Sequence, residues 1–590
     1  MKKIFSFSLI LFLLLTACQQ PAGRDAFSFD EPADPDTLTA ASWQGVTGRV
    51  QAAFGSSSIR YARGVPPREG LSAEWKAVAW RGERIHGQVV VWSTEDVARL
   101  QVSITPLRDG DRQIDAAAVT LHPLGYVLAD TGFTGCRRRS QDTMRAQLSP
   151  GILYENKPFS LPARSVRPVW INIQVPPATA AGTYHGAVVV ATAGDSLYLP
   201  VSIRVQEMVL PPAREWQYHL DLWQNPYAIA RYHKVAVWSQ DHWYLVRKYL
   251  DLLSEAGQKC ITTTIVDKPW HGQTYDPFGS MVGWLHNSDG TWEYDYSVFD
   301  QYVQTAMEQG ITEQINCYTM VTWGNLFRYY DEDSAAYVTL KARPGSPEYE
   351  SLWRPFLLDF RSHLQEMGWL EKTAISLDER GLEDTKNLIR FLQATVPEMK
   401  LTLAGGFFEE IMPDIYDFSY NFWHLKKAKT PSVADGRRTK GRVTTWYVAC
   451  NVPWPNNFTF SPPDESALQG WITAALHLDG FLRWAYNSWP GDVMHDSRFR
   501  TWPSGDTYFV YPGPYSSVRF EKLIEGIQDH EKIRILTEMI REKGITLPDS
   551  LDLQQYLDKI DPAHPFDAAQ YVRKGREMLE EITEMMAGGH

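Results

Sequence analysis

Two acidic residues stand side by side at the end of an apolar run. Residues 373–381 read TAISLDERG, so Asp378 and Glu379 directly follow a short strand-like segment. Paired carboxylates can divide the work of acid/base catalysis when one is protonated and the other ionised. The alternative is that the two residues cap the helix predicted at residues 382–392, because acidic side chains favour helix N-termini.

The spacing of the two carboxylates limits the chemistry they can do on a sugar. Carboxylates that act on opposite faces of a sugar are separated by roughly 5 Å or more. Neighbouring residues at one strand end cannot readily flank a substrate in this way. They do suit a scheme in which the sugar's own 2-acetamido oxygen attacks the anomeric carbon. One carboxylate then orients the acetamido N–H, while the other protonates the leaving oxygen, and the negative charge of the first favours the protonated form of the second.

A barrel would hold these residues in place. Short apolar runs alternate with helical patterns through residues 211–515, which predicts a central (β/α)8 TIM-like barrel. Asp378 and Glu379 then lie at the C-terminal edge of the fourth strand, where this fold places catalytic groups. Long insertions are expected at residues 267–296 and 322–344, and a short or distorted helix within residues 426–442. The predicted strands are residues 216–222, 260–266, 315–321, 373–377, 401–404, 417–422, 443–449 and 481–486.

The flanking segments differ from the barrel in pattern. Residues 42–210 show the period of two that is typical of sheets with one buried face, as at Leu197, Leu199 and Val201. This pattern predicts an N-terminal β-sandwich. Residues 516–590 carry helical spacing and predict a C-terminal helical segment. We therefore expect a multidomain protein.

The N-terminus resembles a bacterial lipoprotein signal. Lys2 and Lys3 precede an apolar stretch, residues 4–15, that is too short to span a bilayer. The sequence LTAC at residues 15–18 resembles a lipobox, so residues 1–17 would be removed and Cys18 would become a lipid anchor. Ordinary signal cleavage beside an incidental cysteine is the alternative. Residues 18–41 are poor in apolar residues, which predicts a tether. The expected location is the cell envelope, in the periplasm or on the outer-membrane surface.

The charge of the chain and its cysteine pattern argue against a nucleic-acid partner and a bound metal. A formal net charge of -12 without a basic stripe argues against nucleic acid, and membrane contact is expected only through the anchor. Cys136, Cys260, Cys317 and Cys450 are scattered, and three of them lie within or beside apolar runs, where buried free thiols are expected. His, Asp and Cys do not cluster at metal-binding spacing, and the proposed chemistry requires no metal or cofactor. The sequence leaves the oligomeric state open.

Several motifs resemble glycoside hydrolase family 123. In the barrel they are residues 375–381 and residues 480–492 (GFLRWAYNSWPGD). A C-terminal motif consists of residues 505–513 (GDTYFVYPG) followed by Ser517, Arg519, Glu521, Gly526, Asp529 and Glu531. In the sandwich they are residues 79–83 (AWRGE) with Gly87 and Gln88. The C-terminal motif is shared with a broader set of barrel proteins, and the Asp-Glu pair narrows the resemblance towards hydrolases. It covers nearly all of the mature chain. It implies a retaining β-N-acetylgalactosaminidase that uses substrate assistance, with Asp378 orienting the acetamido group and Glu379 as general acid/base.

A sugar pocket of this kind needs aromatic walls. The candidates stand at predicted strand ends or in the following loops, although each alone is more often a core residue: Trp223, Trp270, Tyr318, Trp323, Tyr447, Trp484, Tyr486 and Trp489. His271 could donate to a sugar hydroxyl, and its alternative is a solvated loop position. The leading hypothesis is an exo-acting enzyme that releases terminal β-linked N-acetylgalactosamine from glycans or glycolipids. A non-catalytic surface glycan-binding lipoprotein and a β-N-acetylglucosaminidase remain as alternatives.

Overall fold

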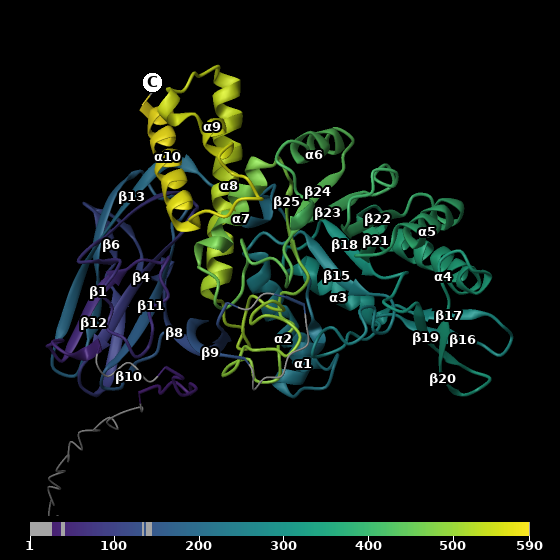
Figure 1. Cartoon of the computed structure of the whole chain (residues 1–590), viewed down its shortest axis with the longest axis horizontal. Coiled ribbons are helices and arrows are strands. Elements are labelled where there is room, and N and C mark those ends of the chain that lie inside the picture. Colours follow the sequence, from purple (N-terminus) through teal and green to yellow (C-terminus); the bar gives the residue numbers. More distant parts are fainter. Residues whose placement is uncertain (1–25, 37–41, 133–134, 137–143, 589–590) are drawn as a thin grey trace, which may run out of the picture.

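The computed structural model describes residues 26–36, 42–132, 135–136 and 144–588 (Figure 1). The predicted signal segment and Cys18 lie outside these residues. Residues 26–36 differ from the predicted tether because they pack on the sandwich. Arg167 Nη1 lies 2.6 Å from Glu31 Oε1, and the Arg167 guanidinium lies 3.7 Å from the centre of the Phe29 ring. An ion pair and a cation–π contact thus hold this stretch in place.

Two sheets form the N-terminal part of the chain. The first has the order β2-β1-β4-β11-β8-β9, and the second runs β10-β5-β12-β13-β3 with β6 and β7 at its side. Inward-facing residues of both sheets share one apolar core, as expected for alternating strands. The strands of the first sheet are β1 (Val50–Gly55), β2 (Leu71–Ser72), β4 (Arg84–Ser93), β8 (Val119–Asp130), β9 (Ala146–Leu153) and β11 (Ser165–Gln174). Those of the second are β3 (Trp75–Arg81), β5 (Val97–Ile104), β6 (Leu107–Asp109), β7 (Arg112–Ile114), β10 (Phe159–Leu161), β12 (Gly182–Ala191) and β13 (Ser196–Val209).

Eight parallel strands make up the central barrel, in chain order around the ring. The ring is nearly closed: the first and second strands meet through a single bridge, Leu220 to Gln258, and the Lys259 N–H donates to Leu220 O at 2.9 Å. The eight predicted strands are all present, with ends shifted by a few residues. They are β14 (His219–Leu222), β15 (Cys260–Thr264), β18 (Gln314–Tyr318), β21 (Thr373–Asp378), β22 (Lys400–Gly405), β23 (Asp417–Asn421), β24 (Val443–Tyr447) and β25 (Gly480–Arg483).

Helices cover the outside of the barrel, where Leu250, Val303 and Leu388 pack against outward-facing strand residues in one large apolar core. The helix between β23 and β24 is short, as predicted for residues 426–442. The barrel helices are α1 (Pro226–His233), α2 (Gln240–Ser254), α3 (Ser297–Glu308), α4 (Pro347–Glu366), α5 (Leu382–Thr395), α6 (Thr430–Arg438) and α7 (Asp464–Ala475). Short 3-10 helices occupy Ala116–Ala118, Ala213–Glu215, Leu370–Lys372, Phe422–His424 and Asp549–Leu551.

The two predicted insertions pair with each other. They form a four-stranded sheet beside the barrel, in the order β17-β16-β19-β20 (lower right in Figure 1). Its strands are β16 (Gly283–His286), β17 (Trp292–Asp295), β19 (Leu326–Asp331) and β20 (Ala336–Lys341). Only the residues at the base of each insertion are left to contribute to the barrel mouth.

The C-terminal helices lie between the sandwich and the barrel (Figure 1). They are α8 (Val518–Lys543), α9 (Leu553–Leu557) and α10 (Ala568–Gly588). Tyr218 N–H at the barrel donates to Glu531 of α8 at 2.9 Å, and the Trp80 indole of the sandwich donates to Thr583 of α10 at 3.1 Å. The helices thus fix the sandwich against the barrel. Within the described residues, no helix combines the length and apolar character needed to cross a membrane.

Candidate active site

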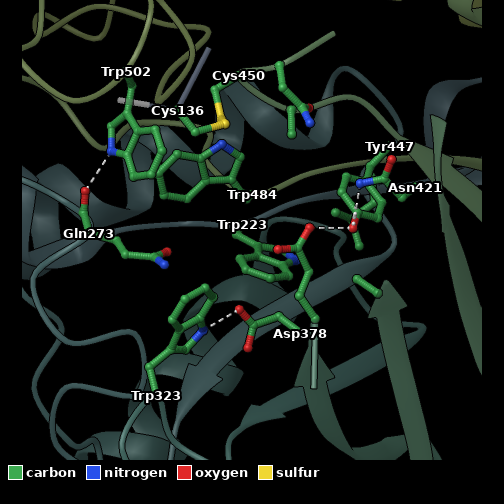
Figure 2. Close-up of a pocket in the computed structure, with 15 residues that line it drawn as sticks. Cys136, Trp223, Gln273, Trp323, Asp378, Asn421, Tyr447, Cys450, Trp484 and Trp502 are labelled. Atoms are coloured by element: carbon green, nitrogen blue, oxygen red, sulfur yellow. Dashed lines mark hydrogen bonds between the residues drawn. A yellow bond between two sulfur atoms is a disulfide. The ribbon is translucent and has the colours of Figure 1, made fainter. Parts of the chain in front are cut away.

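A pocket of about 230 Å³ opens at the C-terminal ends of the barrel strands. Asp378 and Glu379 both line it. Figure 2 shows Asp378 and Trp323 on one side of the pocket, with Trp484, Trp502 and a disulfide on the other. The full lining is Cys136, Trp223, Gln273, Trp323, Asp378, Glu379, Ala404, Asn421, Tyr447, Ala449, Cys450, Asn451, Leu482, Trp484 and Trp502.

A left-handed residue brings both acids to the same cavity. Successive side chains of a strand point to opposite faces, so Glu379 would turn away if β21 simply continued. The strand ends at Asp378 instead, and Glu379 adopts a φ of 39°. Its N–H donates to Ala404 O at 2.7 Å. Gly405 leaves room for this turn, because a Cβ there would lie 3.2 Å from the Glu379 Cα.

The left-handed conformation at Glu379 predicts an unusual stability order among variants. An L-residue with a side chain pays roughly 1–2 kcal/mol in this region, whereas glycine does not. After allowance for the greater freedom of glycine in the unfolded chain, we expect Glu379→Gly to be more stable than Glu379→Ala by about 0.5–1 kcal/mol. Thermal unfolding of the two variants measures the difference. A lower midpoint for the glycine variant would contradict the strained turn.

The Asp378 carboxylate is held from two sides. The Trp323 indole N–H donates to Oδ2 at 2.8 Å, and Arg380 Nη2 donates to Oδ1 at 3.0 Å. The Arg380 guanidinium also lies 4.6 Å from the centre of the Trp323 ring. Burial raises the pKa of Asp378 to about 6; the Arg380 charge opposes this shift and the Glu379 charge adds to it. Asp378 is therefore mainly ionised at neutral pH.

Glu379 has a different partner. The Tyr447 hydroxyl donates to Glu379 Oε1 at 2.7 Å, and Asn421 Nδ2 donates to the Tyr447 oxygen at 3.2 Å. Asp378 thus contacts Trp323, which follows β18, and Arg380, two residues further along the chain. Glu379 instead contacts Tyr447 of β24. The two carboxylates therefore sit in unequal surroundings, as a division of roles requires.

The helix-capping interpretation of the two acids is wrong. Helix α5 has Gly381 as its N-cap residue, with no hydrogen bond from a side chain to the cap. The acidic residues of its first turn are Glu383 and Asp384. Asp378 and Glu379 thus do not cap α5, and both line the pocket.

Four of the predicted aromatic residues line the pocket, namely Trp223, Trp323, Tyr447 and Trp484. Trp270 and Tyr318 lie one layer behind them. The Trp270 ring stacks on Trp223 at 5.2 Å between centroids, and Tyr318 lies 4.5 Å from Trp223. We correct their predicted role from sugar contact to support of the Trp223 ring.

Three further predictions require correction. Tyr486 and Trp489 are fully buried outside the pocket, where their polar atoms donate to Tyr249 O at 3.0 Å and Val510 O at 2.7 Å. Both follow the end of β25 and belong to the large apolar core that surrounds the barrel. His271 is exposed and lines a separate hollow with Lys268 and Arg328.

Several residues of the site were not predicted from the sequence. Asn421 stands at a strand end, and this signal was available. Arg380 adjoins the acidic pair, but nothing in its type indicated that it would fold back onto Asp378. Gln273, Asn451 and Trp502 come from long loops without a pattern. Cys136 and Cys450 form a disulfide across a sequence separation of 314 residues, so the expectation of three buried free thiols holds only for Cys260 and Cys317.

Polar side chains fill the barrel interior below the pocket, where bulky aliphatic residues are usual. Asn316 Nδ2 donates to Asp221 Oδ2 at 3.0 Å, and the Trp223 indole donates to the same oxygen at 3.3 Å. Burial raises the pKa of Asp221 to about 7, and the nearby Asp417 charge adds to the shift. This hydrogen-bonded group fixes the Trp223 ring at the pocket floor.

At the opposite end of the interior, one group of side chains has the types that bind metals. His219, Cys260 and Asp417 bring their polar atoms within 4.8 Å of one another. Their separation in the sequence hid this group from a search for local spacing. His219 Nε2 lies 3.2 Å from Asp417 Oδ2 and 3.2 Å from Cys260 Sγ, so the three side chains already satisfy one another.

A family 123 glycoside hydrolase from Clostridium perfringens, whose structural analysis addressed glycolipid glycan hydrolysis, has a TM-score of 0.82 at 24% identity, covering 91% of this chain and 99% of that one. Two other solved structures are much less similar. A GH10 xylanase with a bacterial Ig-like domain from termite gut has a TM-score of 0.30 at 9% identity, covering 78% of this chain and 100% of that one. A β-glucuronidase from Bacteroides uniformis has a TM-score of 0.29 at 8% identity, covering 82% of this chain and 52% of that one, and neither similarity supports a conclusion about this chain. No curated protein matches the sequence.

Two family models match this chain. The model described as Glycoside hydrolase 123, catalytic domain, matches residues 223–536, and the Glycoside hydrolase 123 N-terminal domain matches residues 54–192. The first match covers more than half of the 590 residues and includes both carboxylates, and the fold agrees with that of the Clostridium protein. The chain therefore belongs to glycoside hydrolase family 123 and is a glycosidase.

Proposed function

We propose that this glycosidase releases terminal β-linked N-acetylgalactosamine with retention of configuration, through attack by the substrate's own acetamido group. One observation carries the proposal: two adjacent carboxylates, Asp378 and Glu379, face a single pocket with different hydrogen-bond partners. Aromatic side chains and the disulfide wall this pocket on two sides, which suits the end of a glycan chain (Figure 2).

In the proposed first step, each acid has its own role. Asp378, ionised and held by Trp323 and Arg380, accepts the acetamido N–H and so turns the acetamido oxygen towards the anomeric carbon. As that oxygen forms its bond, positive charge develops on the oxazolinium ring, and the Asp378 carboxylate stabilises it. Glu379 gives its proton to the departing glycosidic oxygen, which leaves as an alcohol.

The second step reverses the role of Glu379. Its carboxylate takes a proton from water, and the water oxygen attacks the anomeric carbon as the oxazolinium ring opens and the acetamido group, with its N–H, is restored. The Tyr447 hydroxyl donates to Oε1, so Oε2 remains to carry the proton in both steps. Two displacements at one carbon return the product to the β-configuration.

The substrate class has one further support. The Clostridium protein of similar fold was studied for glycolipid glycan hydrolysis. We propose a glycan or glycolipid with a terminal β-N-acetylgalactosamine for this chain as well. An N-acetylglucosaminide differs only at one hydroxyl, and a single hydrogen bond can decide between the two sugars.

The proposed location is the cell envelope, with Cys18 as the lipid anchor. The Cys136–Cys450 disulfide supports export, because disulfides persist in oxidising compartments and are rare in the cytosol. Labelling with a radioactive fatty acid tests the anchor: Cys18→Ser should lose the label, and a label retained in that variant would contradict the proposal.

A substrate panel with proton NMR tests the activity. Aryl glycosides of β-GalNAc, β-GlcNAc, β-Gal and α-GalNAc are compared, and only β-GalNAc should be cleaved efficiently. The first product signal should be the β-anomer, before mutarotation. Initial appearance of the α-anomer, or equal cleavage of the β-galactoside that lacks the acetamido group, would reject the mechanism. Preference for β-GlcNAc would change the proposed sugar but leave the proposed reaction unchanged.

A further inference from the structure

The Cys136–Cys450 disulfide lies in the wall of the pocket (Figure 2). Cys136 belongs to the connection between β8 and β9 of the sandwich, and Cys450 follows β24 of the barrel. The Gly135 N–H also donates to Cys450 O at 2.6 Å. The sandwich therefore reaches the active site and is covalently fastened there.

The loop that carries Trp502 is attached to the same strand of the sandwich. Ser504 donates to the Asp130 carboxylate at the end of β8 from its N–H at 2.8 Å and from its hydroxyl at 2.9 Å. The Trp502 ring packs edge-on against Trp484 at 5.3 Å between centroids. Its indole N–H donates to Gln273 O at 2.8 Å. The disulfide, Trp484 and Trp502 thus form one wall, here called the outer wall.

Glu379 contacts the barrel strand that leads into the outer wall. Asp378 is tied to Trp323, which follows β18, the strand next to β21. Glu379 is tied instead to Tyr447 at the end of β24, three strands further around the barrel. Cys450 follows Tyr447 by three residues. The group that Glu379 protonates, the glycosidic oxygen of the aglycone, is therefore directed towards the disulfide.

We propose that the outer wall is a subsite for the saccharide ring that adjoins the cleaved bond, built jointly by the sandwich and the barrel. This inference rests on the proposed function. Indole faces and the sulfur atoms offer apolar contact to the C–H face of a pyranose ring. The disulfide is a positioning element: it fastens the sandwich loop to the end of the barrel strand within this wall.

Two substrates that differ only in the aglycone test this subsite. One is methyl β-N-acetylgalactosaminide, and the other carries the same sugar β-linked to a galactose residue. In the double variant Cys136→Ser/Cys450→Ser, the ratio of kcat/KM for the disaccharide to kcat/KM for the methyl glycoside should fall about tenfold, the size of one lost stacking contact. The fall should come through KM. Trp502→Ala, which keeps the disulfide, should lower the same ratio.

Reduction of the wild-type protein provides a matched control that does not depend on folding of a variant. Dithiothreitol supplies two electrons and two protons, gives two thiols and becomes its own cyclic disulfide. The ratio should fall in reduced wild-type protein and stay constant when the double variant is treated in the same way. An unchanged ratio in both the reduced protein and the folded variants would overturn the subsite.

Failure of the proposed function gives a separate result. If the wild-type protein cleaves neither substrate, that function fails, and titration calorimetry with the disaccharide then decides the subsite. About tenfold weaker binding after reduction supports it. Equal binding before and after reduction, or no binding at all, overturns it.

Discussion

Replacing Glu379 with Gln is expected to lower kcat/KM for an alkyl β-N-acetylgalactosaminide by roughly 10²–10⁴, the usual contribution of a general acid. Glutamine keeps the shape of the side chain and can still accept the hydrogen bond from Tyr447, so the loss reports the proton alone. An aryl glycoside with an acidic phenol leaves without protonation, and its kcat/KM should fall much less. A series of phenols of rising pKa measures this dependence.

Glu383→Gln is the matched control for this variant. Glu383 lies in the first turn of α5, its side chain is 78% exposed, and it does not line the pocket. Its replacement should leave every substrate unaffected. If Glu379→Gln slowed all leaving groups by the same factor, Glu379 would not be the general acid.

Replacing Asp378 with Asn is expected to lower kcat/KM by roughly 10²–10³, the scale found when one transition-state contact is removed. The amide can still accept from Trp323, but it carries no charge to stabilise the oxazolinium ring. A neutral thiazoline analogue of the intermediate should still bind. Turnover near the wild-type rate would discard the role assigned to Asp378.

The pH profile separates Asp378 from a structural effect. Burial raises the pKa of Asp378 to about 6, and in the proposed mechanism only the ionised form carries the charge that stabilises the oxazolinium ring. The active form is therefore lost as the pH falls, and kcat/KM of the wild-type protein should decline about tenfold per pH unit well below this pKa. The Asn variant should lack this acidic limb. An identical limb in both proteins would assign it to another group.

The strand pattern was enough to predict the barrel and the place of the acids. Parallel strands buried on both faces are short apolar runs, and a residue that follows such a run lies at the mouth of the barrel. Asp378, Tyr447 and Trp223 follow from this rule. The rule fails for Tyr486 and Trp489, because the direction of a side chain beyond the end of a strand depends on a turn that has no period.

The orientation of Glu379 could not be predicted from the sequence. Strand alternation places it on the face opposite to Asp378, and only a left-handed turn beside Gly405 reverses that outcome. The disulfide was equally hidden, because its two cysteines come from the sandwich and the barrel. Both features depend on how distant parts of the chain pack together.

Substrates with fluorinated acetamido groups test the account most directly. Each fluorine withdraws electrons from the amide oxygen and weakens it as a nucleophile, while the sugar and the aglycone stay the same. If the substrate supplies the attacking atom, kcat/KM should fall steeply and in order from acetamido to fluoro-, difluoro- and trifluoroacetamido glycosides. A rate independent of fluorination would mean that the amide does not attack, and the roles of Asp378 and Glu379 argued from their shared pocket would be wrong.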